Sequence, residues 1–206
     1  MRPDLLTAVD FVVFTTREYA AAAGVAMATA SRQLGRAAAS GALVRITRGV
    51  WANAKHPYFD PLACVGRLLG NEQGYVSFLT ALRLHAVIEQ LPRSYHAATT
   101  GHARTLRTPV GTFELFHLAP ALMRRGIEWS TTRLPYRVAT AEKALLDLYY
   151  VSLRRGRRFR SLPELDLRPV TKRRFLELLE DIEDPRIASA VRRRFDEDWS
   201  AFRARR

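Results

Sequence analysis

Three glycines divide the start of the chain into short segments, each long enough for one helix or one hairpin: Gly24, Gly41 and Gly49. Gly24 is placed to end a helix over the alanine-rich segment 17–23, because glycine adopts the left-handed conformation that closes helices. Gly41 is placed to end a second helix over 29–40. Gly49 is the second residue of a two-residue turn, which predicts a β-hairpin. The glycines therefore predict helix, helix and hairpin in that order.

Strands are expected on both sides of this helix pair, at 11–14 and within the hairpin at 43–47 and 50–53. Thr15 and Thr16 can cap the first helix, and a short helix is expected over 3–10. Strand, helix, turn, helix and hairpin is the order of elements in a winged helix-turn-helix. We therefore predict such a domain over residues 1–54.

The composition favours a polyanionic partner, since 33 basic residues outnumber 20 acidic ones and the net charge is +13. The chain has one cysteine, Cys64, so an intramolecular disulfide is excluded and a cytoplasmic location is expected. No apolar run approaches the ~20 residues of a membrane span, and the first residues lack the layout of a signal peptide. We expect no membrane partner.

The second predicted helix has one apolar and one cationic face. With Leu34 at the centre of the buried side, small alanines flank it, so the helix can pack closely. Arg32 and Arg36 lie four residues apart on the opposite side, which carries no acid. The predicted DNA contacts are Thr29, Ser31, Arg32, Gln33 and Arg36 on the helix, and Arg45, Thr47 and Arg48 on the hairpin. A hairpin that contacts protein instead of DNA is the alternative interpretation.

Further phosphate contacts are predicted at the start of the first helix and in the basic segment 154–160, which contains no acid. These candidates are Thr16, Arg17, Arg154, Arg155, Arg157 and Arg158. The alternative is a solvated surface. That alternative is favoured for the last helix, where Arg192, Arg193 and Arg194 are followed closely by acids.

The rest of the chain predicts a mixed α/β (α+β) domain over 55–206. Asp60-Pro61 is a helix start, and Ser77 is placed to cap a further helix. Strands are expected at 95–100, 105–108, 112–118 and 136–138, and helices at 141–151, 171–182 and 186–204.

Three strings carry a resemblance to a known family: SRQLGRAAASGALVRITRGVW at 31–51, YVSFLTALRLHAVIEQLP at 75–92 and VATAEKALLDLYY at 138–150. Together, in that order, they resemble the AbiEi antitoxins of bacterial type IV toxin–antitoxin systems. The resemblance covers residues 11–151. Ala141 stands where the family has proline, and Trp51 replaces the tyrosine of its hairpin string.

The resemblance implies a winged DNA-binding domain followed by an antitoxin domain with C-terminal helices. It implies repression of the chain's own operon through double-stranded operator DNA with inverted repeats. It also implies opposition to a nucleotidyltransferase toxin of the AbiEii type, for which no stable complex is required. No catalytic residue, metal or cofactor is expected, and the chain is not expected to be an enzyme.

The last string also has a reading from its residues alone. Thr140 is placed to cap the helix, and Ala144, Leu145 and Leu148 are placed to pack inward. Lys143 and Asp147 are four residues apart and are expected to pair on the surface.

Two other functions stay open from the sequence. One is a plain winged-helix transcriptional regulator whose second domain binds a ligand or dimerises. The other is a nucleic-acid-processing enzyme, which the pattern disfavours. No histidines lie four apart, no glycine-rich phosphate loop is present, and Ser77 has the setting of a cap and not of a nucleophile.

Overall fold

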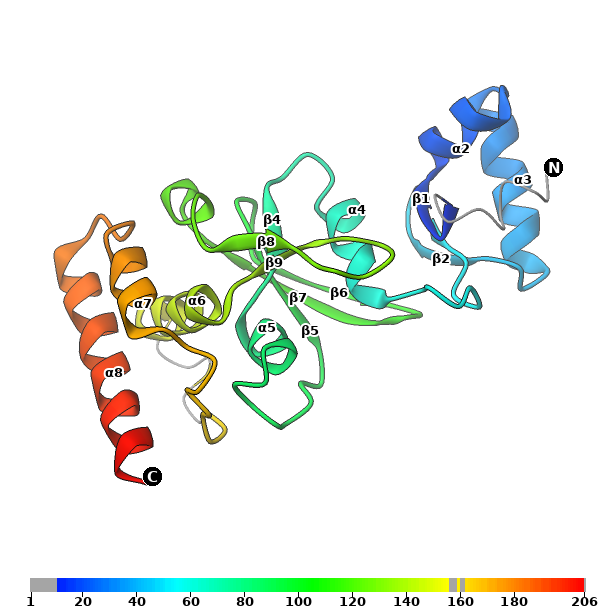
Figure 1. Ribbon diagram of the computed structural model, residues 1–206. Coiled ribbons are helices and arrows are strands. Elements are labelled where there is room, and N and C mark those ends of the chain that lie inside the picture. Colours follow the sequence, from blue (N-terminus) through cyan, green and yellow to red (C-terminus); the bar gives the residue numbers. More distant parts are fainter. Residues whose placement is uncertain (1–10, 156–158, 160–161, 206) are drawn as a thin grey trace. The chain divides into compact units, whose positions relative to one another are not determined.

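The computed structural model describes residues 11–155, 159 and 162–205, which form a mixed α/β structure (Figure 1). These residues divide into two compact units. The first contains the described residues up to Asn71, with Arg107–Thr112 and Thr131–Tyr136. The second contains Glu72–Leu106, Phe113–Ser130 and the described residues from Arg137 onward. The predicted helix over 3–10 lies outside the described residues, and the predicted division into 1–54 and 55–206 stays a prediction.

The first unit begins with the elements that the glycines predict. They are β1 (Val13–Thr15), α2 (Thr16–Ala23), α3 (Met27–Ala39), β2 (Val44–Thr47) and β3 (Val50–Ala52). The strands form an antiparallel sheet in the order β1-β3-β2. Thr15 and Glu18 form a reciprocal capping box at the start of α2, and Gly24 ends that helix with φ of 65°. The predicted cap, C-terminus and hairpin turn are confirmed.

Helix α3 begins at Met27, two residues before the predicted start. Ala26 occupies the N-cap position and offers no side-chain hydrogen bond, so alanine propensity extends the helix past the polar residue expected to start it. The buried side of α3 packs in a core with α2 and the sheet. This core is built around Phe11, Phe14, Tyr19, Ala30, Leu34, Ala37, Leu43 and Trp51.

Asp60 starts the next helical segment as expected, since its carboxylate accepts a hydrogen bond from the Leu62 amide at 2.9 Å. The first turn is a 3₁₀ helix, η2 (Pro61–Cys64), which continues into α4 (Val65–Leu69).

Most of a six-stranded mixed sheet, in the order β6-β7-β5-β4-β9-β8, belongs to the second unit. Its strands are β4 (Gly74–Val76), β5 (Tyr95–Thr99), β6 (Arg104–Thr108), β7 (Gly111–His117), β8 (Ile127–Trp129) and β9 (Arg137–Ala139). A short 3₁₀ helix, η3 (Pro120–Met123), follows β7. The pairs β5–β7 and β4–β9 are parallel, whereas β4–β5 and β8–β9 are antiparallel. Strand β8 was not among the predicted strands.

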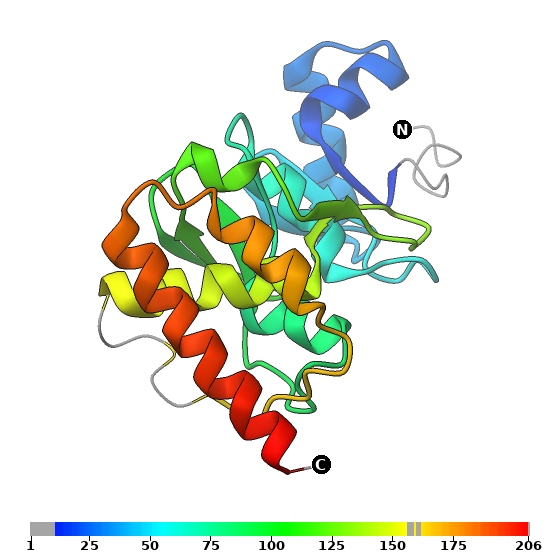
Figure 2. The ribbon, with the colours of Figure 1, turned by 60° about the vertical axis from the view of Figure 1, so that its left-hand side comes forward.

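Four helices accompany this sheet: α5 (Phe78–Leu84), α6 (Ala141–Arg155), α7 (Lys172–Leu179) and α8 (Pro185–Ala204). Helix α6 contacts the other three, and α7 and α8 run beside it in both views (Figures 1 and 2). Within this packing, the rings of Phe175 and Phe195 stack at 3.8 Å between centroids. Helix α6 is therefore surrounded by protein along most of its length. Among the described residues, no helix has the length and apolar character needed to cross a membrane.

Candidate nucleic-acid interface

The side of α3 opposite the core is polar and cationic. Ser31, Arg32 and Arg36 are exposed, while Thr29 and Gln33 are half-buried. Thr29 accepts a long hydrogen bond from Arg32 Nη2 at 3.5 Å. Gln33 Oε1 accepts one from the Tyr19 hydroxyl at 3.0 Å, which ties α3 to α2. Thr29, Arg32 and Arg36 thus share the side of α3 that faces away from the core, and Ser31 and Gln33 lie on its two flanks.

The hairpin presents the second group of predicted contacts. Arg45, Thr47 and Arg48 are exposed around a turn in which Gly49 has a φ of 79°, a conformation that favours glycine. The guanidinium of Arg45 lies 5.6 Å from the centre of the Trp51 ring, a cation–π contact that limits its motion. Trp51 itself is buried inside the module.

The five exposed arginines of this region have no acidic partner within the described part of the chain. They are Arg17, Arg32, Arg36, Arg45 and Arg48. A guanidinium without a carboxylate partner keeps its donors available for phosphate or guanine, each of which it can bind through two parallel hydrogen bonds.

Thr16 was expected to contact phosphate, but the structure places it in the core, with 6 % of its surface exposed. Its hydroxyl accepts a hydrogen bond from Trp51 Nε1 at 2.9 Å, and its amide donates to the carbonyl of Gly49 at 2.9 Å. Both groups are used to join α2 to the hairpin, so Thr16 is not a surface contact. Arg17, the next residue, is exposed.

The predicted basic segment after α6 is described only in part. Arg154 is exposed in the last turn of α6, and its Nη1 donates to the Tyr150 hydroxyl at 2.8 Å. Arg155 is the last residue of that helix, and Arg157 and Arg158 lie outside the described residues.

The string ATAEKALLD begins α6, and its charged residues are buried. Thr140 Oγ1 accepts a hydrogen bond from the Lys143 amide at 3.3 Å, which confirms the predicted cap, and Ala144, Leu145 and Leu148 pack inward as predicted. The expectation that Lys143 and Asp147 pair on the surface is wrong. They do pair, but their side chains are 1 % and 0 % exposed.

Asp147 is the centre of a buried network that joins α6 to β4 and the start of α5. Its Oδ2 accepts hydrogen bonds from the Tyr75 hydroxyl at 2.9 Å and the Ser77 hydroxyl at 2.7 Å, while Oδ1 accepts from Lys143. Ser77 stands at the N-cap position of α5 but makes no capping hydrogen bond, because its hydroxyl is directed to Asp147. Burial raises the pKa of Asp147, against the opposing effects of Lys143 and the two hydroxyls, and burial beside Asp147 raises the pKa of Tyr75.

A pattern in the sequence could have indicated this burial. Residues 144–151 are apolar at every position except Asp147, so apolar side chains cover every side of the helix, which indicates an internal helix. A Lys and an Asp on such a helix must pair inside the protein, because an unpaired buried charge is very unfavourable.

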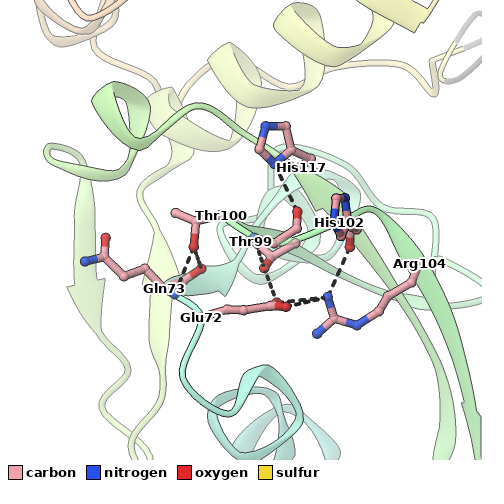
Figure 3. Close-up of polar contacts among 8 residues, drawn as sticks. Glu72, Gln73, Thr99, Thr100, His102, Arg104 and His117 are labelled. Carbon is pink, nitrogen blue, oxygen red and sulfur yellow. Dashed lines mark hydrogen bonds and ion pairs between the residues drawn. The ribbon is translucent and has the colours of Figure 1, made fainter.

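A second polar cluster joins the start of β4 to the turn after β5 (Figure 3). Glu72 accepts hydrogen bonds from the Thr99 hydroxyl at 2.7 Å and from Arg104 Nη1 at 3.1 Å. His117 Nδ1 lies 2.9 Å from the Gly101 carbonyl and donates to it. Burial raises the pKa of Glu72, but hydrogen bonds from Thr99 and Arg104 and the charge of Arg104 outweigh it, so the pKa is lowered. The carboxylate is thus held ionised as a loop anchor.

Ser94, His96 and Glu114 also lie together, but not as a nucleophilic triad. The Ser94 hydroxyl donates to Glu114 Oε1 at 2.6 Å and lies 3.1 Å from His96 Nε2. In a catalytic triad the serine donates to the histidine, and the acid orients the histidine. Within the described ranges, no three His, Cys, Asp or Glu side chains are grouped so that they could hold a metal ion.

No protein-family model matches the chain, and a search of curated proteins finds no match.

Proposed function

We propose that the first 54 residues act as a winged helix-turn-helix that binds double-stranded DNA. In this proposal α3 is the recognition helix, and the β2–β3 hairpin is the wing. The observation that carries the proposal is the exposed side of α3 together with the hairpin tip, where Arg32, Arg36, Arg45 and Arg48 occur without an acidic partner in the described residues. A cluster of arginines without acids is typical of a DNA-binding surface, because the arginines neutralise the phosphates of the DNA backbone.

The dimensions of α3 support this role. Arg32 and Arg36 are separated by about 6 Å along the helix axis, since each residue adds ~1.5 Å. The major groove is about 12 Å wide and admits one helix. Ala30 and Ala37 on the inner side are small and buried, so α3 lies close to its core and exposes its outer side.

We further propose, from the resemblance to AbiEi antitoxins, that the chain represses its own operon and opposes a nucleotidyltransferase toxin of the AbiEii type. The three strings that carry the resemblance occupy α3 with the hairpin, β4 with α5, and α6. Helix α6 is buried within the second unit, so the ATAEKALLD string supports a scaffolding role there. The antitoxin activity is assigned to the second unit by this resemblance.

The DNA-binding proposal is tested by gel-shift titration of the full chain with its own promoter. Arg32→Ala and Arg36→Ala are each expected to weaken specific binding by about 1–3 kcal/mol. Arg193→Ala is the matched control, since it removes one exposed arginine from α8 and changes the net charge equally. Unchanged affinity in both α3 variants would place the reading surface elsewhere.

The antitoxin proposal is tested separately with the Arg32→Ala/Arg36→Ala double variant. We expect the full-length double variant to lose promoter repression but to rescue growth of cells that express the neighbouring nucleotidyltransferase. Growth is the readout because a stable complex is not required. If neither the double variant nor the folded wild-type chain rescues growth, the antitoxin role is contradicted.

A plain regulator is the second candidate, and one observation favours it. The second unit contains a hollow of about 500 Å³ with four apolar and six polar or charged lining residues: Val87, Pro163, Leu165 and Phe202, with Glu89, Gln90, Glu164, Asp166, Arg168 and Arg205. This volume is typical of small-ligand sites. Repression by the wild-type chain without rescue from the toxin would favour this candidate.

A further inference from the structure

The end of β7 and the last turns of α6 enclose a small hollow in the second unit. Its volume is about 150 Å³, and its lining residues are His117, Tyr150, Val151 and Arg154. Three of these four side chains carry hydrogen-bond donors, and none is acidic. The hollow belongs neither to the candidate nucleic-acid interface nor to the buried network around Asp147.

The side chains of Tyr150 and Arg154 hold each other in place through a hydrogen bond and a cation–π contact. Arg154 Nη1 donates to the Tyr150 hydroxyl at 2.8 Å, and the guanidinium lies 5.5 Å from the centre of the same ring. Because the hydroxyl oxygen accepts from Arg154, its own hydrogen is available to a further acceptor. The guanidinium keeps its other N–H groups, and within the described residues it has no ion-pair partner.

His117 lines the hollow from the opposite element. Its Nδ1 donates to the Gly101 carbonyl, which fixes the ring at the end of β7 (Figure 3). Nε2 is then the ring nitrogen left toward a ligand, while the Arg154 guanidinium and the Tyr150 hydroxyl supply the donors.

We infer that the hollow lined by His117, Tyr150 and Arg154 binds the phosphate group of a small ligand. A guanidinium, a hydroxyl and an imidazole on two elements match an anion whose oxygens point in several directions. The volume accommodates one phosphate group but not a whole nucleotide, so the rest of a phosphomonoester would lie outside. Inorganic phosphate and a phosphomonoester share this chemistry.

A neighbouring hollow shows why the anion is assigned to this one. It has a volume of about 220 Å³ and shares Tyr150 and Arg154, but Asp181, Glu183 and Asp184 also line it. Three carboxylates repel an anion, so the hollow beside His117, whose described lining residues include no acid, is the favourable one. The inference does not depend on the proposed binding of DNA by the first unit.

The test uses the full-length chain and two probes, inorganic phosphate and adenosine monophosphate, at constant ionic strength. A ligand at about 100 times its Kd is expected to raise the melting temperature by about 5–10 °C. Chloride at the same ionic strength should produce no such shift. Tighter binding of one probe identifies the source of the phosphate, and binding of either supports the site.

Variants locate the site by calorimetric titration with the tighter probe. Arg154→Gln is expected to raise its Kd by tenfold or more, and Tyr150→Phe and His117→Gln by about fivefold each. Arg193→Gln, which removes an exposed arginine from α8, should leave the Kd within about twofold. Tyr150→Phe retains the buried ring, so it tests the site even if Arg154→Gln fails to fold. Absence of binding by both probes, or an equal loss in Arg193→Gln, would overturn the inference.

Discussion

At the residue scale, Lys143 and Asp147 form an ion pair that is buried in the second unit. Asp147 accepts hydrogen bonds from Lys143, Tyr75 and Ser77, so its charge and its lone pairs are satisfied inside the second unit. Replacing one member of a buried pair leaves the other charge without compensation, which is far less favourable than removing both. Tyr75 lies in β4, so its hydrogen bond to Asp147 also ties α6 to the sheet.

The variant Asp147→Asn is expected to reduce the free energy of unfolding by about 3–5 kcal/mol, because the Lys143 ammonium is left buried and unpaired. Adding Lys143→Met should recover about half of this loss, since the remaining amide oxygen still accepts from the two hydroxyls. Urea unfolding of the wild-type, single and double variants measures both values. Simple additivity of the two substitutions would show that the charges are not coupled.

The lowered pKa of Glu72 predicts that the free energy of unfolding depends on pH. Its pKa in the folded chain is lowered from the ordinary value of 4.5. Its contribution is therefore present above pH 4.5 and is lost as the pH falls through the lowered pKa. Because the side chain is half-exposed and screened, Glu72→Gln should cost only about 0.5–1 kcal/mol at neutral pH.

Glu72→Gln should also remove the part of the acid-induced loss of stability that comes from protonation of Glu72. Urea unfolding at neutral pH and below the ordinary pKa tests the prediction. Glu183→Gln is the control, since Glu183 is exposed and has no ion-pair partner in the described part of the chain. An identical acid profile for wild type and Glu72→Gln would contradict the assignment.

At the scale of elements, the hairpin β2–β3 is held to α2 by contacts inside the first unit. The Trp51 indole donates to Thr16, and the Thr16 amide donates to Gly49. These bonds fix the hairpin relative to the start of α2 and leave Arg45 and Arg48 on the outside. The wing proposed for DNA binding is thus a supported element and not a free loop.

Arg48 at the hairpin turn is expected to contact phosphate and not bases. Arg48→Ala should therefore weaken binding of promoter and random duplexes alike and reduce the salt dependence by about one unit of slope. Gel-shift titrations at several salt concentrations measure both effects. A loss confined to the promoter, with an unchanged slope, would instead identify Arg48 as a base contact.

At the scale of the whole molecule, each of the two compact units has its own buried residues. The first contains the core around Phe14 and Trp51, and the second contains α6 with the stacked rings of Phe175 and Phe195. Cys64 lies buried in the first unit, which makes it a reporter of that unit.

Burial and the nearby charge of Asp60 raise the pKa of the Cys64 thiol to about 12. Since the thiolate is the reactive form, a thiol reagent at mildly alkaline pH should leave the native chain unmodified and label it fully in denaturant. Mass spectrometry of the full-length chain before and after denaturation checks this. Rapid stoichiometric labelling of the native chain would show that the first unit opens readily around α4.

The sequence by itself determined the local elements of the first unit. The Thr15 cap, the end of α2 at Gly24 and the turn at Gly49 were all predictable, because capping and positive φ depend on residues within a few positions of each other. The cationic side of α3 was predictable for the same reason, since helical spacing alone sets which residues share a face.

Only the tertiary structure decided which polar groups are buried. Thr16, Ser77, Lys143 and Asp147 occupy positions that suggest caps or surface pairs, yet each is directed to a partner distant in the sequence or enclosed by other helices. The short strand β8 and the hollow beside Arg154 likewise depend on neighbours far along the chain. Burial is a property of the packed neighbours, and the local pattern around a residue does not specify them.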